Sequence, residues 1–254
     1  MNQAESRYSQ VLITRPQAQA ERLAGLLACV GIDSIVQPAQ EFRPRSLDSS
    51  ERQELTALGP PLLVVFTSPR AVEFGLPQLP PDMLGPSRIA AIGPATARAL
   101  AAAGKPAEIQ PEDGYTSESL LEALAGEPAR NADHALVVCA PGGRELLVEK
   151  LKELGWAARP LWVYERRAAE IRPEALAAIE QADRLLTVFT SADAMNSLSQ
   201  RIRPSAWFAI CRGEWLVISE RLQRLARAFG PSGVHLAPGP HNADLATAIR
   251  SMRP

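Results

Sequence analysis

The sequence predicts an α/β protein made of two flavodoxin-like domains, each built around a parallel sheet. Apolar runs of strand length alternate with helical patterns along the chain, an order typical of parallel sheets with helices on both faces. The order strand, turn, helix, glycine, strand occurs twice, with starts about 125 residues apart. The motif V-F-T-S-x-x-A also occurs twice, in VVFTSPRAVE at 64–73 and in TVFTSADAMN at 187–196.

The first copy begins with the strand VLIT at 11–14, which Arg15 and Pro16 end. Apolar residues spaced three and four apart then predict a helix over 17–30, and Gly31 is a natural stop for it. A short strand within IDSIVQP follows. The helix is expected to bury one face, which carries Leu23, Leu26, Leu27 and Val30.

The first copy continues beyond VVFTS with further helices and strands. Proline near the start and glycine at the end of a segment are helix signals, and hydroxyl side chains are good N-caps. In order, we expect a short helix from Pro69, the strand RIAAI at 88–92, a helix from Pro94 to Gly104, a short strand near 107–109, and a helix in GYTSESLLEAL that Thr116 or Ser117 caps.

The second copy repeats this order. It has one segment without a counterpart, SAWFAICRG at 205–213, which we interpret as a helix. The other expected elements are the strand ALVVCAP at 135–141, a helix over 144–154, the strand in ARPLWVY, the strand and short helix of TVFTSADAMN, the strand WLVIS at 215–219, the helix ERLQRLARAFG, the strand in VHLAPGP, and a helix in NADLATAI that Asn242 caps.

Two divisions into domains fit these elements. Sequential halves would meet in the polar stretch GEPARNADH at 126–134. Alternatively, the polar segments at about 37–46 and 163–173 are crossovers between exchanged domains. In that case residues 42–164 form one domain, and the two chain ends, residues 1–38 and 170–254, form the other. The residues by themselves favour neither division.

The composition is that of a globular chain with room for a buried core: 254 residues, of which 46% are hydrophobic. The net charge of −1 and the lack of a basic tract argue against nucleic acid as a partner but allow a small anionic ligand.

The polar N-terminus and the lack of 18 consecutive apolar residues predict neither a signal peptide nor a membrane span. Cys29, Cys139 and Cys211 fit a reducing cytoplasm, and each is expected to be buried.

Small and polar residues gather where the predicted strands end. The carboxyl ends of parallel strands form the ligand side of such sheets, and the helix N-termini that follow favour anions. The sequence therefore predicts carboxylate or phosphate binding there. A helix needs a cap with or without a ligand, but two matched copies favour the ligand. The turns are Thr14-Arg15, Thr67-Ser68, Gly93 to Thr96, Gly142-Gly143-Arg144, Thr190-Ser191 and Ser219 to Arg221.

Motifs for other chemistry are absent from the sequence. There is no G-x-G-x-x-G dinucleotide turn, no P-loop and no G-x-S-x-G elbow. His134, His235 and His241 lack metal-ligand spacing, and there is no paired C-x-x-C. We therefore expect neither a cofactor nor a metal.

Four segments together resemble the uroporphyrinogen-III synthase family: VFTSPRAV at 65–72, AIGPATARAL at 91–100, LWVYERR at 161–167 and VISERL at 217–222. The resemblance covers about residues 11–250. It implies two flavodoxin-like domains joined by a two-stranded linker, the first of them discontinuous, and so favours the exchanged boundaries. It also implies a monomer that needs no cofactor. Whether the preceding pathway enzyme hands over the substrate by a transient contact is left open.

The family cyclises hydroxymethylbilane, a linear tetrapyrrole with eight carboxylates, to uroporphyrinogen III with inversion of ring D and loss of water. The resemblance places this reaction in a cleft between the domains, where holding one conformer is an orientational task. It implies that Tyr164 assists loss of the ring A hydroxyl. It also implies that the turns at Thr67-Ser68, Thr96 and Thr190-Ser191 contact substrate, and Arg15 is a plausible carboxylate clamp.

The second copy departs from the family pattern in VISERL, which stands where AIGPAT stands in the first copy. Ser219 or Arg221 would have to replace the hydroxyl contact there. Two rival functions stay open on the residues alone. One is a two-domain protein that binds a small anion, and the other is an enzyme for a sugar phosphate or nucleotide that uses the same helix N-termini.

Overall fold

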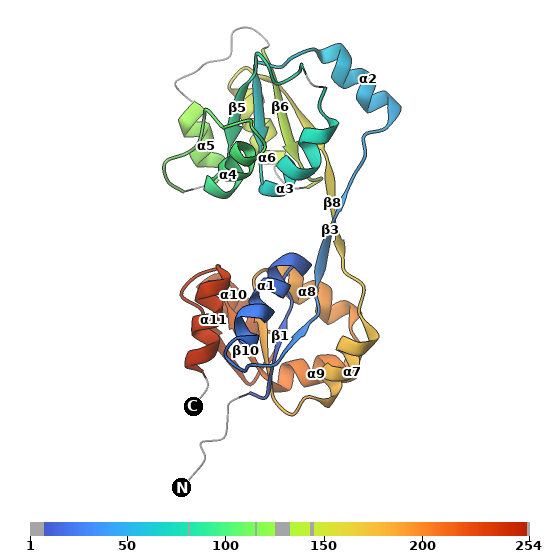
Figure 1. The fold of residues 1–254 in the computed structure, drawn as a ribbon, viewed down its shortest axis with the longest axis vertical. Coiled ribbons are helices and arrows are strands. Elements are labelled where there is room, and N and C mark those ends of the chain that lie inside the picture. Colours follow the sequence, from blue (N-terminus) through green and yellow to red (C-terminus); the bar gives the residue numbers. More distant parts are fainter. Residues whose placement is uncertain (1–7, 81, 115, 125–132, 143–144, 253–254) are drawn as a thin grey trace. The chain divides into compact units, whose positions relative to one another are not determined.

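The computed structural model describes residues 8–80, 82–114, 116–124, 133–142 and 145–252. The chain divides into two compact units. Unit 1 comprises Met1–Glu41 and Arg167–Pro254, and unit 2 comprises Phe42–Arg166. The chain therefore leaves unit 1, builds unit 2 and returns, so unit 1 is discontinuous in sequence (Figure 1).

Unit 1 is built on a parallel sheet whose described strands lie in the order β11-β10-β9-β1-β2. Numbered by their appearance in the unit, this is the flavodoxin order 2-1-3-4-5. The register places Leu12 of β1 opposite Thr187 of β9, and Trp215 of β10 opposite the same Thr187. The strands are β1 (Gln10–Ile13), β2 (Ser34–Val36), β9 (Leu185–Phe189), β10 (Glu214–Val217) and β11 (Gly233–Leu236).

Helices cover both faces of this sheet, as alternation of strands and helices predicts. On one face, α1 (Gln17–Ala28) and α11 (Asn242–Ser251) bury apolar side chains against β1 and β9. The other face is centred on Trp215, whose ring centroid lies 4.6 Å from that of Phe189. The helices on that face are α7 (Pro173–Gln181), α8 (Ala192–Arg201), α9 (Pro204–Arg212) and α10 (Glu220–Arg227).

Unit 2 has a parallel sheet with its described strands in the order β5-β4-β6-β7. Numbered by their appearance in the unit, these strands have the order 2-1-3-4, which matches the first four positions of the order 2-1-3-4-5 in unit 1. The strands are β4 (Leu63–Phe66), β5 (Arg88–Ala91), β6 (His134–Cys139) and β7 (Ala157–Trp162). One face of this sheet is covered by α2 (Ser49–Leu58), α3 (Pro69–Gly75), the 3-10 turn η1 (Leu76–Gln78) and α4 (Pro94–Ala102). The other face is covered by α5 (Ser117–Leu124) and α6 (Glu145–Glu153).

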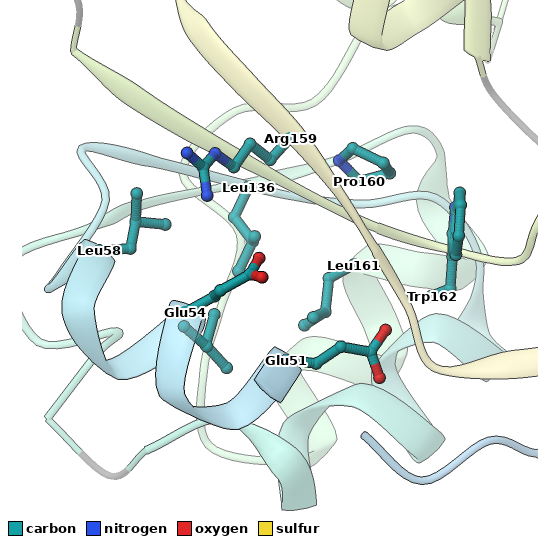
Figure 2. Close-up of a pocket in the computed structure, with 9 residues that line it drawn as sticks. Glu51, Glu54, Leu58, Leu136, Arg159, Pro160, Leu161 and Trp162 are labelled. Carbon is teal, nitrogen blue, oxygen red and sulfur yellow. The ribbon is translucent and has the colours of Figure 1, made fainter. Parts of the chain in front are cut away.

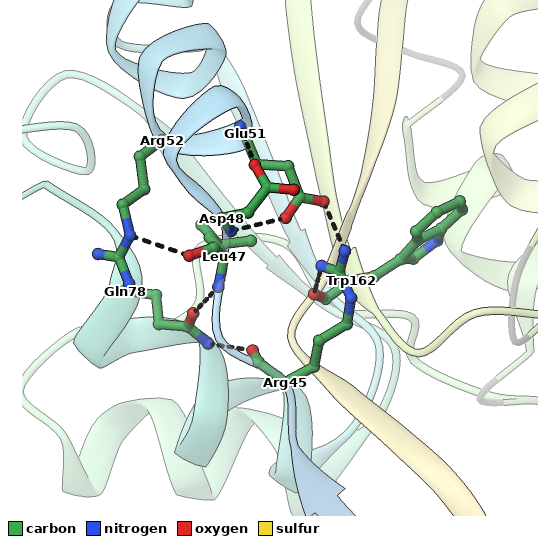
Figure 3. Close-up of polar contacts among 7 residues, drawn as sticks. All are labelled: Arg45, Leu47, Asp48, Glu51, Arg52, Gln78 and Trp162. Atoms are coloured by element: carbon green, nitrogen blue, oxygen red, sulfur yellow. Dashed lines mark hydrogen bonds and ion pairs between the residues drawn. The ribbon is translucent and has the colours of Figure 1, made fainter.

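A two-stranded sheet of β3 (Gln40–Pro44) and β8 (Tyr164–Ala168) carries the chain out of unit 1 and back (Figure 1). Its base in unit 1 is held by the buried Gln37, whose amide donates to the Glu170 carbonyl and accepts from the Arg172 amide. In unit 2, Arg45 donates to the Trp162 carbonyl and to Glu51 (Figure 3). Each end of the sheet is therefore tied to its own unit by side-chain hydrogen bonds.

Four expectations from the sequence are wrong in detail. The side chains of Leu26 and Val30 are 45% and 39% exposed, because α1 ends at Ala28 and buries a narrow stripe of Ala20, Leu23 and Leu27. The segment near 107–109 forms a single bridge from Ile109 to Ala90 rather than a strand. Asn242 is the first residue of α11, and His241 is the N-cap. Cys29 is exposed, while Cys139 is buried as expected and Cys211 is half-buried.

Two helices, α2 and α7, are not among the elements expected from the sequence. A signal for α2 was present in D-S-S-E, because Asp48 and Glu51 form a capping box at its start. Pro173 at the first position of α7 was a similar signal. Both helices follow the crossover strands, whose polar composition hid the change to a helical pattern. No helix in the described part of the chain combines the length and apolarity that a membrane span needs.

Candidate functional site

The two copies of V-F-T-S fold into the same turn. Ser68 ends the loop after β4 with φ −166° and ψ 162°, and Ser191 after β9 has φ −153° and ψ 152°. Each hydroxyl oxygen accepts a 3.1 Å hydrogen bond from the backbone N–H three residues later. Ser219 repeats this geometry at the start of α10, with a bond of 3.3 Å from Leu222. The three serines are therefore N-caps, whether or not they also contact a ligand.

The threonines at the strand ends divide into two groups. The Thr67 hydroxyl donates to the Val138 carbonyl at 3.0 Å, and the Thr14 hydroxyl donates to the Val188 carbonyl at 2.7 Å. Both tie the end of one strand to the next strand of the sheet. The hydroxyls of Thr96 and Thr190 have no hydrogen-bond partner among the described residues. These two hydroxyls are therefore the ones available to a ligand.

The start of α4 differs from the serine-capped helices. Its N-cap is Gly93, with extended backbone at φ −163° and ψ 173°, and no side chain caps it. Pro94 occupies the first helical position and has no N–H to satisfy. Thr96 in the first turn is 4% exposed. Because no side chain among the described residues caps this helix start, its first N–H groups lack a capping partner, and it suits an anionic group better than the serine-capped turns do.

The turn after β6 is described only in part. Gly142 has φ 68°, a left-handed conformation that favours glycine. Gly143 and Arg144 lie outside the described residues. Ser219 is accounted for as a cap, and Arg221 is exposed on α10, with no partner in the part of the chain that the structure describes.

Arg15 is 9% exposed, and most of its donors are occupied by the protein. Its Nε and Nη2 both donate to Gln19 Oε1, and its Nη1 donates to the Pro240 carbonyl and to Asn242 Oδ1. Burial lowers the pKa of this guanidinium from its ordinary value, although an arginine stays charged at neutral pH. Arg15 thus joins the end of β1 to the start of α11. It borders a surface hollow of about 600 Å³ that Arg22 and His241 also line.

Tyr164 lies in unit 2 at the start of β8, and its side chain is 4% exposed. Its ring packs between Phe42 and Phe74, with centroids 6.0 Å away in each case. Its phenolic oxygen lies 3.1 Å from the Ser68 hydroxyl oxygen. The structure therefore brings together Tyr164 and Ser68, two residues that are 96 positions apart.

Sequence reasoning missed Arg70 and Phe42 in this cluster. The guanidinium carbon of Arg70 lies 3.7 Å from the centroid of the Phe42 ring, a cation–π contact. The signal for Arg70 was available, because the repeated motif has Arg70 in one copy and Asp193 at the same place in the other. No pattern in the sequence pointed to Phe42, which lies in the polar crossover.

A separate hollow of about 150 Å³ lies between α2 and β7 in unit 2 (Figure 2). Leu58, Leu136 and Trp162 give it an apolar lining, and Glu54 and Arg159 add charges. None of the residues predicted from the sequence to bind a ligand lines it. Within the described residues, no group of three or more His, Cys, Asp or Glu side chains is placed to hold a metal ion.

Comparison with known proteins gives concordant results. The family model described as uroporphyrinogen-III synthase HemD matches residues 21–247. The uroporphyrinogen-III synthase of Escherichia coli (strain K12) is 30% identical over 96% of this chain and 99% of its own length. That of Salmonella typhimurium (strain LT2) is 32% identical over the same shares of the two chains.

Solved structures support the fold. A mutant uroporphyrinogen III synthase from the extremely thermophilic bacterium Thermus thermophilus superposes with a TM-score of 0.61 at 22% identity, and covers 96% of this chain and 98% of that one. Uroporphyrinogen-III synthetase from Helicobacter pylori 26695 has the same TM-score at 16% identity, with 95% and 99% covered. At these identities the likeness shows the fold alone.

Proposed function

The chain belongs to the uroporphyrinogen-III synthase family, and on that premise we propose that the polar turns after its strands bind and orient a linear tetrapyrrole. The chain cyclises hydroxymethylbilane to uroporphyrinogen III, with inversion of ring D and loss of water, as a hydro-lyase of tetrapyrrole and heme biosynthesis. The observation that carries this assignment is the family match across nearly the whole length.

Tyr164 is proposed as the proton donor to the ring A hydroxyl that leaves as water. The contact between Tyr164 and Ser68 supports this role. The Ser68 oxygen already accepts from the Ala71 amide, and its own proton is free to point at the Tyr164 oxygen 3.1 Å away. In that arrangement the phenolic proton is directed away from Ser68, and a hydrogen bond to the leaving oxygen assists departure.

The carboxylates of the substrate are proposed to occupy the turns that retain open donors. Thr96 and Thr190 are supported by hydroxyls without partners in the described residues, and Gly93 by the helix start that no side chain caps. The proposal extends to the other predicted turns, Ser68, Ser191, Ser219 and Arg221, and the turn of Gly142, Gly143 and Arg144. It includes Thr67 and Arg15 as secondary contacts, because the Thr67 hydroxyl and most donors of Arg15 already bond within the protein. Holding many carboxylates at once selects one conformer of a flexible chain, which is the entropic part of the task.

The two units are proposed to act as the domains of the enzyme, with residues 1–38 and 170–254 in one and residues 42–164 in the other. The division of the chain at Glu41–Phe42 and Arg166–Arg167 supports these boundaries. We further propose a cytoplasmic monomer. Three cysteines without disulfides suit a reducing compartment, and light scattering on a sizing column would measure the mass.

The test of the reaction uses enzymatically prepared hydroxymethylbilane. The protein is incubated with it, the product is oxidised to porphyrin, and isomers I and III are separated. Uncatalysed closure gives the unrotated isomer I, so isomer III above the blank is the expected result. Isomer I alone, formed at the blank rate, would refute the assignment. Saturable nucleotide binding with no response to tetrapyrroles would instead favour a phosphate-ligand enzyme.

A further inference from the structure

Arg70 is a cation with no ion-pair partner in the described part of the chain. Its guanidinium packs on the Phe42 ring, and it forms no ion pair or hydrogen bond with any described residue. Burial lowers the pKa of Arg70, and the charge of nearby Arg166 lowers it further while Tyr164 and Glu73 raise it. The side chain nevertheless stays protonated at neutral pH. A half-buried charge without a partner is unfavourable, so this placement calls for an explanation.

The repeated motif makes the placement more informative. Ser68 and Ser191 start α3 and α8 with the same cap geometry. Two residues after the cap, α8 has Asp193, whose charge suits the positive start of a helix. In α3 the same place holds Arg70, whose charge opposes the local field. Local conflicts of this kind in an otherwise consistent fold are typical of functional positions.

The surroundings of Arg70 indicate what it would hold. The Phe42 ring that carries the guanidinium also packs against Tyr164. Tyr164 in turn touches Ser68, two positions before Arg70 in the sequence. Arg166 adds a second cation near Arg70. A guanidinium that packs over an aromatic ring still has N–H groups to donate, and its fork of donors matches the two oxygens of a carboxylate.

We infer that Arg70 is a substrate-binding residue that holds one carboxylate of the tetrapyrrole beside Tyr164. This inference rests on the proposed function and adds a residue to it. Binding there would set the distance between the leaving hydroxyl and the phenol, so Arg70 would select the productive conformer as well as contribute affinity. The competing explanation is structural, with Arg70 serving only to hold Phe42 and the β3 strand through the cation–π contact.

The experiment compares the wild type with Arg70→Gln, Arg70→Lys and the matched control Arg159→Gln. Arg159 is an exposed cation of the same unit that lines the hollow between α2 and β7 (Figure 2). The probe is uroporphyrin, a stable porphyrin with eight carboxylates, titrated against the tryptophan fluorescence of the full chain. Initial rates with hydroxymethylbilane and melting temperatures complete the set.

We expect Arg70→Gln to weaken uroporphyrin binding and to raise KM about tenfold, the scale of one charge-assisted contact. The difference from wild type should shrink in about 0.5 M salt, because salt screens such contacts. The affinity and KM of Arg70→Lys should lie between those of the wild type and of Arg70→Gln, because lysine keeps the charge but loses the paired donors of the guanidinium. The affinity and KM of Arg159→Gln should stay within about twofold of the wild-type values, because this change removes a charge away from Arg70, Phe42 and Tyr164.

Probe binding by Arg70→Gln within about twofold of wild type, at low and high salt, would overturn the inference. A fall in melting temperature that Phe42→Leu reproduces, with affinity unchanged, would establish the structural explanation. If Arg70→Gln does not fold, Arg70→Lys decides, and wild-type affinity in that variant would also overturn the inference. A wild type that makes no isomer III would refute the proposed function itself, which is a separate outcome.

Discussion

The phenolic oxygen of Tyr164 lies 3.1 Å from the hydroxyl oxygen of Ser68, and that hydroxyl also caps helix α3 by accepting from the Ala71 amide. One serine thus joins the first strand–helix turn of unit 2 to the strand through which the chain leaves it. The side chain proposed as the acid is therefore held by the same residue that starts the helix, and changes at either residue should be felt at the other.

Replacement of Tyr164 by phenylalanine removes the proposed donor and keeps the ring between Phe42 and Phe74. We expect turnover to fall by no more than about a hundredfold, the low end of general-acid effects, while the melting temperature changes little. The isomer assay with hydroxymethylbilane measures the rate. An unchanged rate would show that Tyr164 is a packing residue.

Thr96 and Thr67 should respond differently to replacement by alanine. Thr96→Ala removes a hydroxyl that has no partner in the described residues, so folding should be nearly unaffected and KM should rise. Thr67→Ala removes the bond to the Val138 carbonyl, so the free energy of unfolding should fall by about 1 kcal/mol. Urea denaturation and steady-state kinetics check the pair. A large loss of stability in Thr96→Ala would contradict the ligand role.

Arg15→Gln should destabilise unit 1. The change removes charged hydrogen bonds to the Pro240 carbonyl and to Asn242, which join β1 to α11. The expected loss in the free energy of unfolding is about 2 kcal/mol. Arg22→Gln removes the same charge from an exposed side chain. Its free energy of unfolding should stay within about 0.5 kcal/mol of the wild-type value. If Arg15→Gln unfolds like wild type but binds uroporphyrin weakly, Arg15 is a carboxylate clamp rather than a structural tie.

Cys139 should resist thiol reagents in the native state. Burial, with a smaller effect of Glu145, raises its pKa to about 11 from an ordinary value of 9.0. It should therefore stay protonated at about pH 8, where exposed Cys29 reacts with an aromatic disulfide. Modification in the presence and absence of urea, with Cys29→Ser as the control, measures this. Native labelling of Cys139 at the rate of Cys29 would contradict the prediction.

The same pKa has a consequence for stability. Because the folded thiol keeps its proton to a higher pH than the unfolded one, its contribution to stability is fully present below pH 9.0. It should be lost as the pH rises through about 11. Denaturant midpoints of the wild type and of Cys139→Ala across that window should converge at the alkaline end.

Most of the order of strands and helices was predictable from the chain because its signals are local, although α2 and α7 were not expected. Strand VLIT at 11–14 and the helix SAWFAICRG at 205–213 correspond to β1 and α9 within a few residues. Leu26 shows the limit of prediction from local spacing, because the spacing places it on the buried face and the structure leaves it exposed. Apolar spacing identifies a helical face, but the width of the buried stripe depends on what packs against it.

The sequence by itself determined the α/β class, the repeat and the polarity of the strand ends, because alternation of apolar runs and helix capping act over a few neighbouring residues. Only the tertiary structure decided which of those polar groups already have a partner within the protein. Thr67 donates to Val138, Arg15 donates to Pro240, and Arg70 rests on Phe42. Each partner comes from a distant segment, so whether a donor remains open to a ligand depends on contacts that no local pattern encodes.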